Sequence, residues 1–225
     1  MPKPSADPAP RRRGRPSTLD REGALDAAVG LFWRHGYEGT SIADLTAAMG
    51  VTPPSLYAAF GSKEDLYRDA LAHYLDREGE RERAEAFRQE PSAYRAIEAY
   101  LRDLVRHFVN PAKPAGCMVS NSVLRYAMEN KAAADAVAAI RAVALEELRL
   151  KFDEAKRDGQ LPKTTNPAAL ARFYSAIVQG MSTQACDGAG SHMLDSLVDV
   201  ALAAWPGTRP RRPPPGRKSK AHVRA

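Results

Sequence analysis

The sequence predicts an all-α protein of about nine helices, in which a small three-helix domain precedes a larger helical domain. Apolar residues recur at the i, i+3, i+4, i+7 spacing of a helix, for example within 25–32, 97–108 and 170–181. Period-two runs of β-branched residues, which are typical of strands, do not occur in the sequence. Glycine and proline clusters divide the apolar stretches into three short helices followed by longer ones.

Positive charge is concentrated at the two ends of the chain. The net charge of +6 over 225 residues divides into +4 for residues 1–18, +7 for residues 206–225 and −5 for the residues between them. Both ends are also rich in proline, so we expect a disordered basic arm over 1–18 and a disordered basic tail over 206–225. Basic ends on an acidic body indicate a polyanionic partner, either nucleic acid or an anionic membrane.

The composition argues against several classes of protein. The two cysteines, Cys117 and Cys186, and the five histidines have no metal-ligand or disulfide spacing, so we expect no metal and a reducing, cytoplasmic location. The first residues lack the apolar core of a secretory signal, and the Ala-rich stretch 132–145 is interrupted by Asp135 and Arg141, so no membrane span is expected. Without a phosphate-binding glycine loop or a nucleophile elbow, we expect neither an enzyme nor a cofactor.

The first two helices have clear boundaries. The first, over about residues 19–34, ends beside a glycine that can adopt the left-handed conformation. Thr40 and Ser41 are N-cap candidates for the second helix, whose apolar residues lie within 42–49. Gly50 then makes a tight turn into the third helix.

The third helix begins with adjacent prolines. Thr52 is placed to cap it, and Pro53 at its first position loses no hydrogen bond because first-turn amides have no intrahelical partner. Leu56 and Phe60 are four residues apart and point inward, so the opposite side carries Thr52, Pro54, Ser55 and Tyr57. Two short helices joined by a glycine turn form a helix-turn-helix, whose second helix lies in the major groove of DNA. The next helix is capped by Ser62 and has Lys63 in its first turn, where a nearby phosphate would explain a cation that opposes the helix dipole.

The stretch GYEGTSIADLTAAMGVTPPSLYAAFGSKEDLY, residues 36–67, resembles the DNA-binding domain of the TetR/AcrR transcriptional repressors. The resemblance implies a helix-turn-helix DNA-binding domain over 19–65 and a helical ligand-binding and dimerisation domain over 66–205. It implies phosphate contacts by Thr40, Ser41, Tyr57 and Lys63, and base contacts by Thr52, Pro54 and Ser55. Because the third helix has no Arg, Asn or Gln for bidentate base pairing, sequence readout would rest on small contacts, thymine methyls, DNA shape or the N-terminal arm.

The arm contains Arg13-Gly14-Arg15-Pro16, which looks like the core of an AT-hook. In that interpretation Arg13 and Arg15 lie in a narrow A·T minor groove. The alternative is a generic basic segment that adds only non-specific affinity for phosphates.

The resemblance also implies a ligand pocket within the fourth to seventh of the predicted helices. Candidate lining residues are Tyr74, Tyr100, Leu104, Phe108, Met118, Ser122, Tyr126 and Phe173. Residues of these types at helical spacing more often form a plain core, and the sequence does not separate the two. Cys117 joins this set: it begins a helix, as does a similar Gly-Cys step in some repressors of the family, and in at least one electrophile sensor that cysteine reacts. Its other interpretation is a small apolar residue packed in the bundle.

The eighth and ninth helices of this count carry apolar stripes, within 170–181 and 194–202, that resemble the pair through which family members form homodimers. A two-fold dimer matches a palindromic operator in double-stranded DNA. The sequence therefore predicts a ligand-responsive, sequence-specific transcriptional regulator, a repressor released by a small-molecule inducer or by thiol modification. The alternative is an architectural DNA-binding protein dominated by its basic tails, with little sequence specificity.

Overall fold

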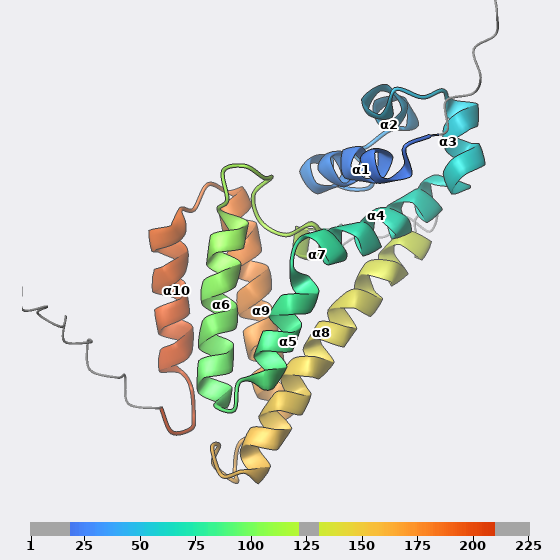
Figure 1. Ribbon diagram of the computed structural model, residues 1–225. Helices are drawn as coiled ribbons and strands as arrows, with labels where there is room; N and C mark the ends of the chain where they lie inside the picture. The colour runs from blue at the N-terminus through green and yellow to red at the C-terminus, as the bar shows by residue number, and fades with distance from the viewer. Residues whose placement is uncertain (1–18, 122–130, 210–225) are drawn as a thin grey trace, which may run out of the picture.

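The computed structural model describes residues 19–121 and 131–209, and these residues form ten α-helices and no strand (Figure 1). The helices are α1 (Arg21–His35), α2 (Ile42–Met49), α3 (Pro53–Phe60), α4 (Lys63–Arg77), α5 (Glu80–Gln89), α6 (Ala93–Phe108), α7 (Met118–Asn121), α8 (Lys131–Arg157), α9 (Pro167–Cys186) and α10 (Ser191–Ala203). The predicted all-α fold class is confirmed. The arm over 1–18, most of the predicted tail, and the pocket candidates Ser122 and Tyr126 lie outside the described residues.

Local hydrogen bonds set the boundaries of the helix-turn-helix. The Ser41 hydroxyl accepts a bond from the Asp44 amide (3.1 Å), and the Asp44 carboxylate accepts one from the Ser41 amide (2.9 Å), which is a capping box at the start of α2. Gly50 ends α2 in the left-handed region, with φ 66°, where a residue with a Cβ is disfavoured. The Thr52 hydroxyl accepts a bond from the Ser55 amide (3.4 Å), so α3 begins at the first proline as predicted.

The described residues form one helix more than expected, because the helix predicted after Ser62 breaks at Gly79. This glycine has φ 72° and separates α4 from α5. The Glu78 amide makes the last bond of α4, to the Tyr74 carbonyl (2.9 Å), and α5 then leaves in a new direction (Figure 1). As a result α4 packs under α1 while α5 packs along α6.

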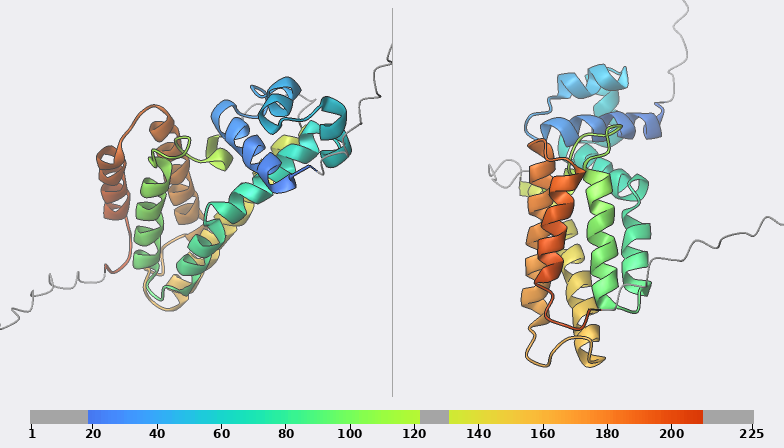
Figure 2. Two further views of the ribbon diagram at one scale, coloured as in Figure 1. Left: turned by 45° about the horizontal axis from the view of Figure 1, so that its top comes forward. Right: turned by 90° about the vertical axis from the view of Figure 1, so that its left-hand side faces the viewer.

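Two hydrophobic cores hold these helices together. One joins α1–α4 with α7 and the start of α8, around Phe32, Leu45 and Leu56. The other joins α5, α6, α9, α10 and the second half of α8, around Phe108 and Phe152. In this second unit α6, α9 and α10 stand side by side (Figure 2).

The described chain continues a few residues past α10. Trp205 is buried, and the Thr208 amide donates to the Gln160 carbonyl (3.3 Å), so residues 206–209 pack against the turn that follows α8. None of the described helices combines the length and the apolar character that crossing a membrane requires.

Candidate nucleic-acid interface and ligand cavity

One side of α3 is exposed, and it is the side that the sequence predicts. Thr52, Pro54, Ser55 and Tyr57 are all exposed, and Tyr57 keeps 47% of its surface accessible. Leu56 and Phe60 lie on the opposite side and are buried in the core. The hydroxyl oxygens of Thr52 and Ser55 lie 2.9 Å apart, so two small hydrogen-bonding groups stand together at the helix N-terminus.

Two of the residues predicted to contact phosphate, Ser41 and Lys63, lie at the starts of α2 and α4. Ser41 is exposed beside its capping box. The Lys63 ammonium lies over the Tyr37 ring, 4.2 Å from the centroid, which is a cation–π contact. Burial lowers the pKa of Lys63 below its ordinary value, while Glu64 and Glu38 act in the opposite direction. The ring therefore holds this cation in place beside the N-terminus of α4.

Thr40 differs from the other predicted contacts. Its side chain is buried, and its hydroxyl donates to the Gly36 carbonyl at 2.8 Å. This bond spans the turn between α1 and α2, so the hydroxyl supports the loop from within. The arginines of the arm, Arg13 and Arg15, lie outside the described residues.

A partly open cavity of about 400 Å³ lies between the two cores and is lined by residues of α4–α9. Four of the predicted residues line it: Tyr74, Tyr100, Leu104 and Cys117. Phe108 and Met118 point instead into the cores, where each is at most 2% exposed, and Phe173 is 39% exposed on α9. A volume of this size is within the usual range for a small-molecule site.

Much of the apolar part of the cavity wall comes from residues that the sequence does not single out, although they lie on predicted helices. Further apolar lining residues are Leu75, Val119, Ile140, Leu148 and Val178. Several of these residues come from α8 and α9, whose apolar stripes do not reveal from sequence alone that part of each stripe borders a cavity.

The cavity also has charged lining residues from the charge-rich run at 77–85. Glu80 and Arg81 line the cavity, and Arg83 is turned inward with its side chain only 8% exposed. Arg83 donates to Asp103 (2.8 Å), to Glu80 (2.5 Å) and to the Glu78 carbonyl (3.2 Å), so it joins the α4–α5 junction to α6. The sequence signal that was missed is Gly79, which turns the face of α5 inward.

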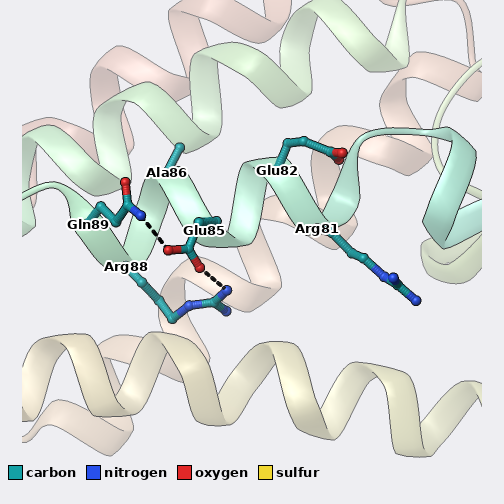
Figure 3. Close-up of a pocket in the computed structure, with 6 residues that line it drawn as sticks. All are labelled: Arg81, Glu82, Glu85, Ala86, Arg88 and Gln89. Atoms are coloured by element: carbon teal, nitrogen blue, oxygen red, sulfur yellow. Dashed lines mark hydrogen bonds and ion pairs between the residues drawn. The ribbon is translucent and has the colours of Figure 1, made fainter.

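A second, open hollow of about 620 Å³ lies on α5 (Figure 3). Its side chains are paired with one another: Glu85 accepts bonds from Arg88 (2.6 Å) and from Gln89 (2.5 Å). Arg88 also donates to Glu147 of α8 at 2.7 Å. The Arg88–Glu147 pair ties α5 to α8, and the hollow lies on the surface of α5 next to it.

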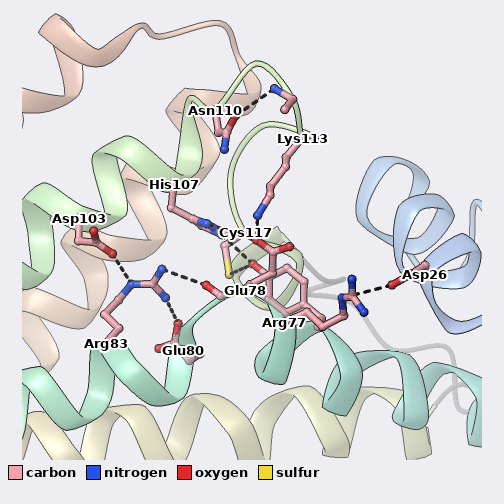
Figure 4. Close-up of polar contacts among 12 residues, drawn as sticks. Asp26, Arg77, Glu78, Glu80, Arg83, Asp103, His107, Asn110, Lys113 and Cys117 are labelled. Carbon is pink, nitrogen blue, oxygen red and sulfur yellow. Dashed lines mark hydrogen bonds and ion pairs between the residues drawn. The ribbon is translucent and has the colours of Figure 1, made fainter. Parts of the chain in front are cut away.

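The two cysteines have different surroundings. Cys117 is partly buried and lines the cavity; its amide donates to the Ser182 hydroxyl (2.8 Å), and its sulfur accepts a bond from the Tyr74 hydroxyl (3.4 Å) (Figure 4). Cys186 is exposed as a residue, and its sulfur accepts a bond from the side-chain nitrogen Nδ2 of Asn121 (2.9 Å). The thiol itself is partly covered, and this burial is the main cause that raises its pKa. Among the residues that the structure describes, no three His, Cys, Asp or Glu side chains gather as metal ligands would.

The last two helices each have an inner and an outer apolar face. Much of the predicted pairing stripe is buried in the chain's own bundle, including Tyr174, Met181, Leu194, Val198 and Leu202. A second face is exposed, with Phe173 at 39%, Met193 at 61% and Val200 at 69%. Spacing alone identifies an apolar face of a helix, but it does not show whether that face packs in the core of the same chain or is exposed.

Comparison with known proteins agrees with this arrangement. Residues 24–70 match the model of bacterial regulatory proteins of the tetR family, and residues 93–186 match the tetracyclin repressor-like C-terminal domain. The HTH-type transcriptional repressor ComR of Escherichia coli (strain K12) is 35% identical over 196 residues, which cover 87% of this chain and 93% of ComR. BdcR, a repressor of the same organism, is 29% identical over 191 residues, 85% of this chain and 90% of its own.

Solved structures show the same relationship. A cysteine mutant of the TetR family transcriptional regulator CifR, complexed with 26-bp double-strand operator DNA, is 42% identical and superposes with a TM-score of 0.80. The match covers 86% of this chain and all of the CifR chain. A helix-turn-helix, a helical domain with a cavity, and relatives of this similarity together show that the chain belongs to the TetR family of bacterial regulatory proteins.

Proposed function

We propose that the protein is a dimeric, cytoplasmic transcriptional repressor that binds a palindromic operator and releases it when a small molecule occupies the cavity or modifies Cys117. The observation that carries the proposal is the exposed side of α3, a helix capped by Thr52. This helix belongs to a TetR-family fold that also has a cavity beside α4. The names of ComR and BdcR, and the operator complex of CifR, support this assignment. The protein would act by binding, without catalysis.

The two domains would have different roles. Residues 19–65 would bind DNA, with Thr52, Pro54 and Ser55 against bases and Ser41, Tyr57 and Lys63 against phosphates. Residues 66–205 would bind the effector and form the dimer. Since α2 and α3 contain no Lys or Arg, the basic arm would supply much of the attraction to phosphate.

The cavity indicates the chemistry of the effector. Its wall is mostly apolar, and its charged members, Glu80, Arg81, Arg141 and Glu147, balance in sign. Each of these side chains also has a protein partner, such as Arg83 for Glu80 and the Val119 carbonyl for Arg141. A mostly apolar, uncharged molecule therefore fits the cavity best, because it leaves these pairs intact.

The dimer would form through the exposed outer faces of α9 and α10. Phe173, Met193 and Val200 give these faces the large apolar side chains that a stable interface buries. Two helices from each chain would then make a four-helix contact.

Selection from genomic DNA tests the proposal. The purified protein is mixed with fragments of its source genome at physiological salt, and the bound fraction is sequenced. Enrichment of one palindrome is expected, and Tyr57→Ala should weaken binding to it while Leu150→Ala, which removes an exposed side chain on α8, should not. Uniform recovery with only an A·T bias would refute the proposal and favour an architectural protein dominated by its basic ends.

A further inference from the structure

We propose that the Tyr74 hydroxyl transmits occupancy of the cavity to the DNA-binding domain, through a cluster of three rings formed by Trp33, Tyr74 and His107. The inference rests on the proposed effector response and names the residues that would carry it. Tyr74 belongs to α4, lines the cavity, and contacts α1 of the helix-turn-helix unit.

The three rings bring three helices together at the junction of the domains. Trp33 of α1 meets Tyr74 edge-on, with centroids 4.9 Å apart and planes at 87°. The same indole stacks on His107 of α6, at 5.8 Å and 24°. Trp33 and Tyr74 are buried, and the His107 side chain is 9% exposed, so none of the rings can move far without moving a neighbour.

The hydroxyl of Tyr74 connects this cluster to the cavity. It donates to the sulfur of Cys117 (3.4 Å), which also lines the cavity, and it lies 3.2 Å from Nε2 of His107. A molecule that displaces the Tyr74 hydroxyl from Cys117 therefore also changes the hydrogen bonding of His107, the ring on which Trp33 rests.

Ionic contacts on the other side of His107 hold the end of α4 (Figure 4). Glu78 accepts a bond from Lys113 (2.5 Å), and its carboxylate lies 3.6 Å from Nδ1 of His107. Arg77 donates to Glu22 of α1 (2.5 Å). Because α4 is fixed to α1 here, a shift of His107 and Tyr74 reorients the helix-turn-helix with α4 and leaves the internal packing of that unit intact.

The chain provides a defined way to occupy the cavity without knowing the natural effector. In a Cys186→Ser, Trp205→Phe background, Cys117 is the remaining cysteine and Trp33 the remaining tryptophan. With iodoacetamide the Cys117 thiolate displaces iodide and retains a carbamidomethyl group, and mass spectrometry confirms that one group is added. Trp33 emission reports on the ring cluster, because the indole contacts the rings of Tyr74 and His107.

Tyr74→Phe tests the coupling, and Tyr100→Phe is its matched control. Both changes remove one hydroxyl from a tyrosine of the same cavity, but Tyr100 packs against Phe87, away from Trp33. Alkylation should shift Trp33 emission and lower affinity for the selected operator by about tenfold in the background chain and in Tyr100→Phe, within the usual range of allosteric coupling. In fully alkylated Tyr74→Phe, the emission shift should be largely abolished and the change in affinity should fall below about twofold.

The outcomes separate this inference from the proposed function. A full emission shift in alkylated Tyr74→Phe, or no shift in the background chain, overturns the coupling even when an operator is bound specifically. Loss of affinity on alkylation with unchanged Trp33 emission also overturns it, because release would then follow another route. Absence of specific DNA binding refutes the proposed function, whereas the emission comparison still decides whether Tyr74 links the cavity to α1.

Discussion

Gly116 should be far less tolerant of a side chain than Gly50, although both have left-handed backbones with φ of 73° and 66°. A Cβ added at Gly50 meets no atom within 4 Å, whereas one at Gly116 would lie 2.7 Å from the Ser182 carbonyl and 2.5 Å from Nδ2 of Asn121. Alanine at either position therefore pays the cost of a left-handed backbone, but only alanine at 116 also collides with neighbouring atoms.

The magnitude follows from these contacts. The left-handed conformation costs an alanine about 1–2 kcal/mol, partly offset because alanine stiffens the unfolded chain. The Ser182 carbonyl that an alanine at 116 would meet belongs to α9, so relief of the clash must move Ser182. That movement disturbs two bonds of the Ser182 hydroxyl, one from the Cys117 amide (2.8 Å) and one to the Asn121 side chain (2.8 Å). Two such bonds add about 2 kcal/mol. We expect a loss of about 1 kcal/mol for Gly50→Ala and about 3 kcal/mol for Gly116→Ala.

Urea denaturation followed by circular dichroism measures both values. The protein concentration must be the same for each variant, because dissociation of a dimer makes the apparent stability depend on it. If the two variants lost equal stability, the close packing of Gly116 against α9 would be refuted, and with it the fixed position of Cys117 at the cavity.

Three further predictions concern the DNA-binding unit and the domain junction. Thr52→Ala should lower the free energy of unfolding by about 1 kcal/mol because α3 loses its N-cap, and Thr52→Ser should retain it, as measured in urea. Deletion of residues 1–18 removes five basic side chains; operator affinity should fall, and the slope of log affinity against log salt should become shallower by about 0.9 for each phosphate that the arm neutralises, while the palindrome stays preferred. An unchanged slope would show that the arm does not touch DNA. Burial lowers the pKa of His107 to about 4, below its ordinary 6.5, so the unfolded chain takes up this proton first as pH falls. Unfolding free energy should therefore decrease by up to about 3 kcal/mol between pH 6.5 and 4, and His107→Gln should flatten that part of the profile.

The helix-turn-helix could be predicted closely because its signals are local. The Ser41–Asp44 capping box and the Thr52 cap each act within four residues, and Gly50 acts through its own backbone. Such interactions do not depend on the rest of the fold, so the boundaries of α2 and α3 and the exposed side of α3 follow from a short stretch of sequence.

The candidate cavity could be predicted only in part. Tyr74, Tyr100, Leu104 and Cys117, which the sequence suggests as lining residues, border the cavity, and so do Glu80 and Arg81, which the sequence does not suggest. Their positions depend on the left-handed Gly79, which directs α5 after the break, and on Arg83, whose partner Asp103 lies twenty residues away on α6.

Local sequence is sufficient for the helical class, the helix-turn-helix and the exposed side of α3, because caps, glycines and apolar spacing act over a few residues. Which helix faces meet a core, a cavity or solvent depends instead on how the helices pack. Phe173 and Tyr174 are neighbours on α9, yet one is 39% exposed and the other buried. The contact of Trp33 with His107 likewise joins residues from separate helices, and such contacts exist only once the packing directions of the helices are set.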